Sequence, residues 1–309
     1  MIVRVNKGGL LTTVQDRGRW GHQAAGVPVA GPMDSYSHRL ANVLVGNDED
    51  AATLEVTVAG PELEFTDARL VAVTGAAFEH VSDAVIEVRA GDRLTFGPRL
   101  RGARAYVAIS GGIDTPRVLG SRATHVPSGM GGRPLKAGDE LPLGRRDGPP
   151  KGGHYVRSVR VRSVRLQADH GDDPTTLRIL PGPQADRFPP RALDVLQSAA
   201  YRVGADSNRM GYRLAGPRIE HLKGADIISD ATPLGVLQVP ASGQPILLMA
   251  DRQTTGGYAK LATVISADIS RAGQVAPGGE IRFAVCTPAD ALAALIAQER
   301  RLMAIAGRA

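Results

Sequence analysis

The chain has 309 residues, of which 43% are hydrophobic and 4% aromatic, and it carries a net charge of +6. This length is enough for one large or two medium hydrophobic cores, and the single cysteine excludes an intramolecular disulfide or a zinc site built from paired cysteines. The first residues, MIVRVNKGG, lack a signal-peptide pattern, and no apolar stretch approaches the roughly 20 residues that span a bilayer. We therefore expect a cytoplasmic protein without a membrane association.

Short strand-like runs separated by Gly/Pro turns follow one another between Leu54 and Ser110. Regular short strands of this kind favour an all-β barrel or sandwich over alternating strands and helices. Before these runs, Asp34 can cap a helix that Gly46 ends. We predict a β-barrel-like first domain over residues 1–142.

A basic segment over residues 143–173 is predicted to link two domains. Its seven cations between positions 145 and 165, against Asp147 alone, account for the whole net charge. Nucleic-acid binding favours cations spread over a folded face and interleaved with aromatic rings, and only Tyr155 is present here. We interpret the segment as a solvated linker or a docking strip for an acidic partner, and expect no nucleic-acid binding.

The second half repeats the strand-and-turn pattern, with runs such as LRIL, PLGVLQV and EIRFAV. Pro190 suits the first turn of a short helix, and Thr287 with Asp290 resembles a capping box that opens a C-terminal helix. The sequence thus predicts a mainly β fold with a few short helices, and a second domain over residues 174–309.

Several familiar motifs are absent from the sequence. There is no P-loop, Rossmann fingerprint, HExxH or GxSxG, and the seven histidines form no local metal-binding motif. No lysine follows a methionine, so we expect no covalently attached biotin. We predict no metal-ligand residues in this chain.

Three polar, glycine-containing clusters remain, at residues 12–34, 207–217 and 229–260. In the first, Gln15, Asp16, Arg17 and Arg19 can contact an anionic or amide ligand. In the third, a hydrophobic strand delivers polar side chains to a predicted Gly256-Gly257 turn. Such clusters suit a polar ligand, or are elaborate turns whose side chains satisfy backbone groups, and both interpretations stay open.

These clusters, together with ISGGIDTPRVLGSRAT from Ile109 and LRILPGPQADRF from Leu177, resemble the biotin-dependent carboxyltransferase family. This family is also called the allophanate hydrolase subunit 2 family, and it includes the KipI antagonist KipA, the C subunit of 5-oxoprolinase and part of urea carboxylase. The resemblance runs from about Gly9 to Phe283. It implies two cyclophilin-like β-barrel domains and a partner, the KipI-like B subunit, with a LamB/YcsF-like A subunit in the 5-oxoprolinase.

The reaction implied by the resemblance is the ATP-dependent opening of 5-oxo-L-proline to L-glutamate, with ATP and Mg²⁺ used at the level of the complex. A five-membered lactam is a poor electrophile, and phosphorylation of its oxygen would activate the ring carbon toward water. Such a site needs cationic donors for the phosphoryl group and an acid or base near the ring.

The motifs suggest a role for each polar residue under this resemblance. Arg252 would contact a phosphoryl or carboxylate group, and Asp230 and Asp251 would handle protons or a metal. The substrate would be oriented or bound by the remaining candidates, which are Gln238, Gln253, Thr254, Asn208, Arg209, Gln15 and Asp16.

Two alternatives accompany this prediction. One is transfer of a carboxyl group from carboxybiotin to urea or a related amide, which needs further chains. The other is regulation by binding a KipI-like protein alone, which requires only an exposed binding face.

Overall fold

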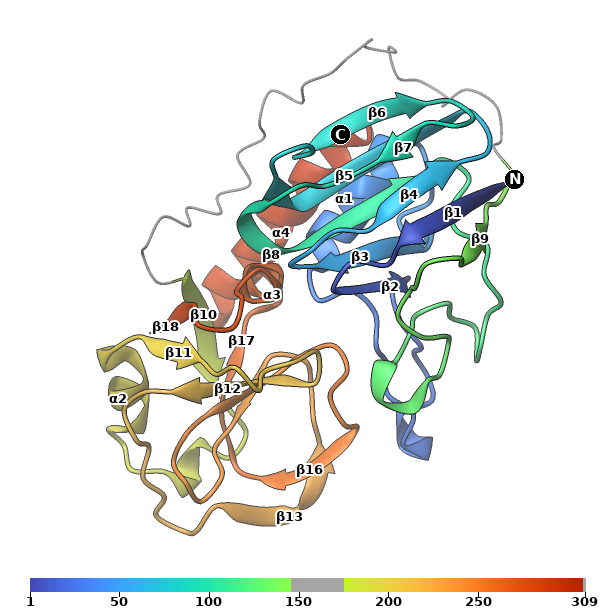
Figure 1. Ribbon diagram of the computed structural model, residues 1–309. Coiled ribbons are helices and arrows are strands. Elements are labelled where there is room, and N and C mark those ends of the chain that lie inside the picture. The colour runs from blue at the N-terminus through green and yellow to red at the C-terminus, as the bar shows by residue number, and fades with distance from the viewer. Residues whose placement is uncertain (146–174, 308–309) are drawn as a thin grey trace. The chain divides into compact units, whose positions relative to one another are not determined.

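The computed structural model describes residues 1–145 and 175–307 (Figure 1). Residues 146–173 of the predicted basic linker lie outside the described residues. Among the described residues, none of the helices is both long and apolar enough to cross a membrane. Strands dominate the described chain, which confirms the prediction of a mainly β fold with a few helices.

The described residues form two compact units. Unit 1 contains residues 1–19, 30–145 and 299–307, and unit 2 contains residues 20–29 and 175–298. The predicted domains, 1–142 and 174–309, differ from these units at residues 20–29 and at the end of the C-terminal helix.

Unit 1 contains nine strands. They are β1 (Ile2–Lys7), β2 (Leu11–Gln15), β3 (Thr53–Thr57), β4 (Glu62–Phe65), β5 (Arg69–Phe78), β6 (Ala84–Val88), β7 (Arg93–Leu94), β8 (Arg99–Ile109) and β9 (Glu140–Pro142). They form two antiparallel sheets, one in the order β7-β4-β1-β9 and the other in the order β2-β3-β8-β5-β6. Side chains from both sheets fill one shared core, so the expected barrel of the first domain consists here of two sheets.

The alternation of side chains along β5 explains how the five-stranded sheet is covered on both faces. Val71 and Val73 point into the shared core, whereas Leu70 and Ala72 belong to a second core that also contains Ala41 of helix α1 (Ser35–Leu44). A strand that is buried on both faces is apolar almost throughout, and burying each Val or Leu side chain contributes about 1.5–3 kcal/mol.

Helix α1 begins as its sequence predicts. The Asp34 carboxylate accepts a hydrogen bond from the Ser37 backbone N–H at 2.9 Å, which satisfies one of the free donors of the first turn. Also within unit 1, the Arg39 guanidinium donates two hydrogen bonds of 2.6 Å to Glu299 in helix α4 (Pro288–Ile305).

Unit 2 is organised around a closed barrel of seven strands. They are β10 (Thr175–Pro181), β11 (Tyr201–Val203), β12 (Gly211–Ala215), β14 (Val236–Gln238), β15 (Ile246–Leu248), β17 (Lys260–Val264) and β18 (Glu280–Val285). Their order is β10-β17-β14-β15-β12-β11-β18, and parallel pairing of β10 with β18 closes the barrel. Leu177 and Phe283 lie opposite each other across this seam and are buried, so the seam is sealed by apolar contacts.

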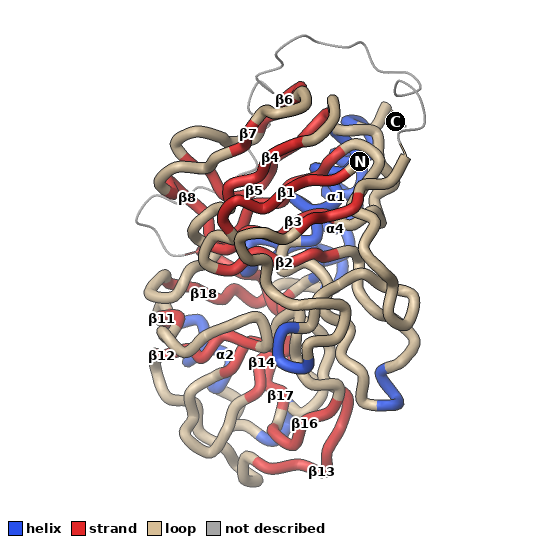
Figure 2. The backbone as a smooth tube through the Cα atoms, turned by 45° about the vertical axis from the view of Figure 1, so that its right-hand side comes forward, coloured by secondary structure: helices blue, strands red, loops and turns tan. Residues whose placement is uncertain are grey.

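Two further strands of unit 2, β13 (Asp226–Ala231) and β16 (Thr255–Tyr258), form a separate antiparallel sheet, here called the ribbon. Figures 1 and 2 both show the two strands side by side. The remaining described elements are helices α2 (Ala192–Ser198) and α3 (Ser266–Gly273) and short 3-10 turns at Gln23–Ala25, Val126–Ser128 and Ala185–Arg187. The sequence did not predict α3.

The capping box predicted at the start of α4 is confirmed. The Asp290 N–H donates to Thr287 Oγ1 at 3.1 Å, and the Thr287 N–H donates to Asp290 Oδ2 at 3.0 Å. Two backbone donors are thus satisfied reciprocally, as the residue spacing requires.

Candidate functional site

Most predicted site residues lie in unit 2, and the ribbon brings several of them together. Asp230 lies in β13, opposite Gly256 of β16, and Gln253 and Thr254 immediately precede β16. The Thr254 carbonyl accepts a hydrogen bond from the Thr232 N–H at 3.1 Å, which fixes the entry to the ribbon. Residues about 25 positions apart therefore share one local structure.

Gly256 is a strand residue, which corrects the prediction of a Gly256-Gly257 turn. A Cβ atom at position 256 would lie 2.7 Å from Gln238 Nε2 and 3.2 Å from Gln253 Nε2. The absent side chain therefore leaves room for two amides to approach the ribbon backbone. Glycine is needed here for close approach, and its flexibility plays no part.

The two amides interact only loosely with their surroundings. Gln253 Nε2 lies 3.5 Å from Gln238 Oε1, and Gln238 Nε2 lies 3.4 Å from the Tyr258 carbonyl oxygen. Both contacts are long for N–H···O hydrogen bonds, so a polar ligand can compete for these donors and acceptors. The position of both side chains agrees with the predicted substrate-orienting role, which remains a prediction.

Arg252 is a half-buried cation beside the ribbon. Its Nε donates to the Thr232 carbonyl at 2.7 Å and its Nη1 lies 3.4 Å from the Met249 carbonyl. Burial lowers the pKa of Arg252 to about 10. Within the described residues it has no carboxylate partner. A desolvated guanidinium with unused N–H donors is suited to an anionic ligand.

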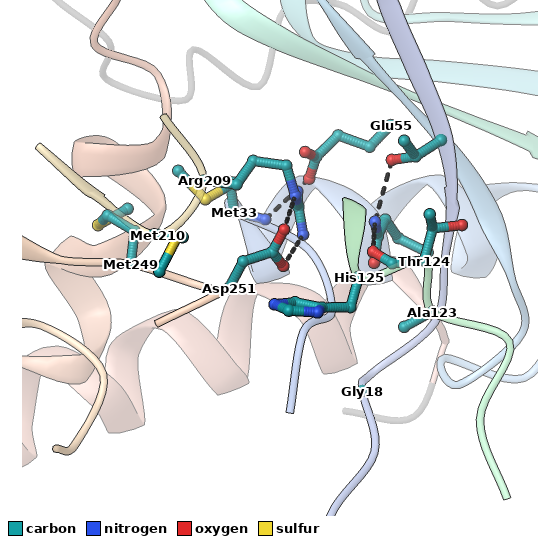
Figure 3. Close-up of polar contacts among 12 residues, drawn as sticks. Gly18, Met33, Glu55, Ala123, Thr124, His125, Arg209, Met210, Met249 and Asp251 are labelled. Carbon is teal, nitrogen blue, oxygen red and sulfur yellow. Dashed lines mark hydrogen bonds and ion pairs between the residues drawn. The ribbon is translucent and has the colours of Figure 1, made fainter. Parts of the chain in front are cut away.

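Asp251 and Arg209 form a closed ion pair within unit 2. Arg209 Nε and Nη2 lie 3.0 and 2.9 Å from the two carboxylate oxygens of Asp251, as Figure 3 shows, and both side chains are buried. The Asp251 N–H also donates to the Arg209 carbonyl at 2.8 Å. These are the contacts of a fold-supporting pair, and the predicted role of Asp251 in catalysis stays a prediction.

Asp230 is paired with a residue that the sequence analysis did not select. Lys260 Nζ lies 2.7 Å from Asp230 Oδ2, and the lysine is 1% exposed whereas the aspartate side chain is 53% exposed. Lys260 and the Ala231 N–H hold the pKa of Asp230 below its usual value. The signal in the sequence was a lysine between Ala259 and Leu261, at the first position of β17 (Lys260–Val264).

Asn208 stabilises a turn. Its Oδ1 accepts a hydrogen bond from the Met210 N–H at 2.8 Å, and its own N–H donates to the Gly211 carbonyl at 3.2 Å. Asparagine commonly closes turns in this way. Its predicted role in substrate binding remains a prediction.

Gln15 and Asp16 lie in unit 1, are buried, and contact residues 121–124, which are more than 100 positions away in the sequence. Gln15 Nε2 donates to Thr13 Oγ1 and to the Thr124 carbonyl. Asp16 accepts from the Ser121 hydroxyl at 2.5 Å and from the Arg122 N–H at 2.6 Å. Asp16 thus holds the 121–122 turn in place, and a ligand-binding role for either residue remains a prediction.

A cavity of about 400 Å³ lies in unit 1 and contains none of the predicted site residues. Its wall includes residues 110–114 of the ISGGID motif, the loop 45–48, and Arg117. The motif is partly explained by packing, because a Cβ at Gly111 would lie 2.7 Å from Arg69 Nη1. The ribbon in unit 2, where the polar side chains gather, is the stronger candidate for chemistry.

Most of the chain, including the ribbon, matches one known protein family. A family model described as the carboxyltransferase domain, subdomain A and B, matches residues 25–285. The chain belongs to this family. The match covers parts of both units and confirms the family predicted from the sequence motifs.

Individual relatives fall into two groups. The C subunit of the 5-oxoprolinase of Escherichia coli (strain K12) is 38% identical and is matched over 99% of this chain and 98% of its own length. The protein of the same name from Haemophilus influenzae is 34% identical over 88% of this chain and 87% of its own. The crystal structure of the K. lactis urea amidolyase, 30% identical, superposes with a TM-score of 0.86 over 98% of this chain. This chain spans only 20% of that urea amidolyase.

Proposed function

We propose that this chain is the C subunit of an ATP-dependent 5-oxoprolinase, which opens 5-oxo-L-proline to L-glutamate. The similarity to relatives of that name extends over nearly the full length of both chains, whereas the urea amidolyase is matched over a fifth of its length. This similarity over nearly all of both chains supports the same role for this chain, as one subunit of a multi-subunit enzyme.

The proposed complex contains two further chains, a KipI-like protein and a LamB/YcsF-like protein, and it uses ATP with Mg²⁺. The exposure of the ribbon supports a covering partner surface, because five of the six residues of β13 are exposed and Ile228 is 94% exposed. A hydrolytic site must control access of water to an activated substrate. A surface from another subunit would supply the walls that the ribbon lacks.

Arg252 is the residue on which the proposed substrate site mainly rests. The carboxylate of 5-oxoproline, or a phosphoryl group on its lactam oxygen, would give this half-buried cation the anionic partner that it lacks among the described residues. Gln238 and Gln253 would orient the ring through amide hydrogen bonds. The residues beside the ribbon thus combine an anion-binding cation with two polar amides.

ATP with Mg²⁺, when bound, supplies the phosphoryl group that activates the lactam oxygen. In the described part of the chain, no group of three His, Cys, Asp or Glu side chains could hold a metal ion. The role proposed here for the described residues of this chain is to bind and orient the substrate.

The test is ATP hydrolysis by the chain assembled with its partner subunits, with and without 5-oxoproline. We expect turnover that requires 5-oxoproline and yields glutamate. Arg252→Ala should lower kcat/KM roughly 100-fold, while Arg282→Ala, which alters an exposed arginine of the same unit, should have no effect. A complex that ignores 5-oxoproline would refute the function, and full activity of Arg252→Ala would refute the site.

A second candidate is carboxyl transfer from carboxybiotin to urea or a related amide. The carboxyltransferase family model and the TM-score of 0.86 with a urea amidolyase favour it. Assembly with a biotin carboxylase, and urea-dependent consumption of carboxybiotin, would distinguish it from lactam opening. Regulation of a KipI-like protein by binding alone makes no demand on Arg252 or on the two amides.

A further inference from the structure

Lys260, the partner of Asp230, has an environment that is unusual for a lysine. Its backbone is fixed on both sides by Gln184, since the Lys260 N–H donates to Gln184 Oε1 at 3.2 Å and its carbonyl accepts from the Gln184 N–H at 3.3 Å. Its ammonium group is 2.7 Å from Asp230 Oδ2. One ion pair thus connects strand β17 of the barrel to strand β13 of the ribbon.

Stability alone does not account for this lysine. An ammonium group removed from water is unfavourable unless it is closely paired, and a buried ion pair is often no more stabilising than apolar side chains of the same volume. A methionine at position 260 would fill similar space without any cost of desolvation. Packing therefore does not explain the charge at position 260. Because the ammonium group contacts Asp230, its role is to be sought in an effect on that carboxylate.

The pair is asymmetric. The ammonium is enclosed by protein, but the Asp230 side chain is half exposed. Its Oδ2 accepts from Lys260 and its Oδ1 accepts from the Ala231 N–H at 2.7 Å. The Gln184 side chain also hydrogen-bonds this carboxylate. Two oxygens offer about four acceptor sites, so the half-exposed carboxylate is fixed from the protein side and still open to a ligand. The lowered pKa of Asp230, caused mainly by Lys260, keeps it ionised at neutral pH.

The neighbours of Asp230 define which ligand fits. Asp230 lies opposite Gly256, around which the Gln238 and Gln253 amides gather, and Arg252 bonds to the Thr232 carbonyl next to the end of β13. A ligand at this position would find an anionic acceptor, amides and a cationic donor. A cyclic amide that carries a carboxylate has the matching groups, which are a ring N–H donor, a carbonyl oxygen and an anion.

Building on the proposed function, we propose that Lys260 is a positioning residue that fixes Asp230 as a carboxylate, and that Asp230 accepts the hydrogen bond of the ring N–H of the cyclic amide. Lys260 itself does not touch the substrate. Its effect passes through the orientation and charge of Asp230.

The first test needs no activity. The carboxyl ¹³C resonance of Asp230 is titrated in the full chain and in the variants Lys260→Met and Lys260→Arg. We expect the pKa of Asp230 to rise in Lys260→Met and to return toward the wild-type value in Lys260→Arg. Lys223→Met, which breaks an exposed pair with Asp186, is the matched control and should leave Asp230 unchanged. An unchanged pKa in Lys260→Met overturns the inference.

The second test uses the assembled enzyme. Asp230→Asn and Lys260→Met should each raise KM for 5-oxoproline about tenfold through loss of a charge-assisted hydrogen bond, and the double variant should be no worse than the poorer single variant. Activity needs ionised Asp230, so the acid limb of kcat/KM should move to higher pH in Lys260→Met. A variant with a lower melting temperature but an unmoved acid limb would show that Lys260 is merely structural.

The two hypotheses fail in different ways. If the wild-type complex does not respond to 5-oxoproline, the proposed function and the ligand named here are both refuted. If that complex is active but Lys260→Met keeps its wild-type KM and pH profile, only the role of Lys260 is refuted.

Discussion

Removing the Asp251 carboxylate tests whether this residue supports the fold or the chemistry. In Asp251→Ala, the Arg209 guanidinium loses two hydrogen bonds of 3.0 and 2.9 Å in an environment where both side chains are buried. The backbone hydrogen bond between the two residues can persist, because it does not involve the side chain. We therefore expect a folded but markedly less stable protein.

The size of the effect follows from the burial of the pair. Breaking a buried ion pair costs about 3–5 kcal/mol, and here two charge-assisted hydrogen bonds are lost from a buried site. For a unit of this size, such a loss lowers the melting temperature by roughly 10 °C. Replacing both residues with methionine removes both charges of the pair and should restore part of the lost stability.

Thermal unfolding followed by circular dichroism measures this, with the double variant Arg209→Met/Asp251→Met as the matched control. A wild-type melting temperature for Asp251→Ala would refute the structural reasoning. The additional variant Asp251→Asn separates the two roles, since it preserves the shape of the side chain. Loss of turnover in Asp251→Asn without any loss of stability would support the catalytic role predicted from the sequence.

Three further predictions concern other buried or half-buried ionisable groups. Burial lowers the pKa of His38 from 6.5 to about 4, so the unfolded state binds more protons between these values and stability falls by about 3 kcal/mol as the pH is lowered through that window. Urea denaturation at pH 7 and pH 4 should show this, and His38→Gln should lose less; equal losses would contradict it. Arg39→Ala removes the two half-buried hydrogen bonds to Glu299 and should lower the free energy of unfolding by about 1–2 kcal/mol. Hydrogen exchange over residues 299–305 should become faster, and unchanged exchange would contradict this prediction. Lys260→Met should keep the wild-type melting temperature, whereas Asp230→Ala, which removes the carboxylate partner of a buried ammonium group, should lower it. A lower melting temperature for Lys260→Met than for Asp230→Ala would contradict this difference in burial between the two side chains.

The sequence predicts the elements that local chemistry determines. The caps at Asp34 and Thr287 are correct because a cap depends on residues three positions apart. The strand pattern is correct because alternation and turn residues are local signals. Helix α3 was missed because it has only eight residues and no side-chain cap at its start.

The assignment of residues to compact units could not be obtained in the same way. Residues 20–29 belong to unit 2 and residues 299–307 to unit 1. Both depend on contacts between segments far apart in the chain, such as Arg39 with Glu299, and nothing in the local composition marks them. The close approach of Gln238 to Gly256 is of the same kind, which explains why the Gly-Gly dipeptide predicts a turn that the structure does not contain.

The contrast between Asp230 and Asp251 shows where sequence reasoning about the site reaches its limit. Both are aspartates next to an apolar strand in one motif, and residue type gives them equal weight. In the structure each is held by one cation, but the Asp251 side chain is 1% exposed and both its oxygens are taken by Arg209, whereas the Asp230 side chain is 53% exposed. A carboxylate can receive a ligand only if an accessible lone pair remains. The two aspartates therefore differ mainly in their partners. The buried Arg209 guanidinium occupies both oxygens of Asp251, whereas Lys260 contacts Asp230 from the barrel and leaves its carboxylate accessible.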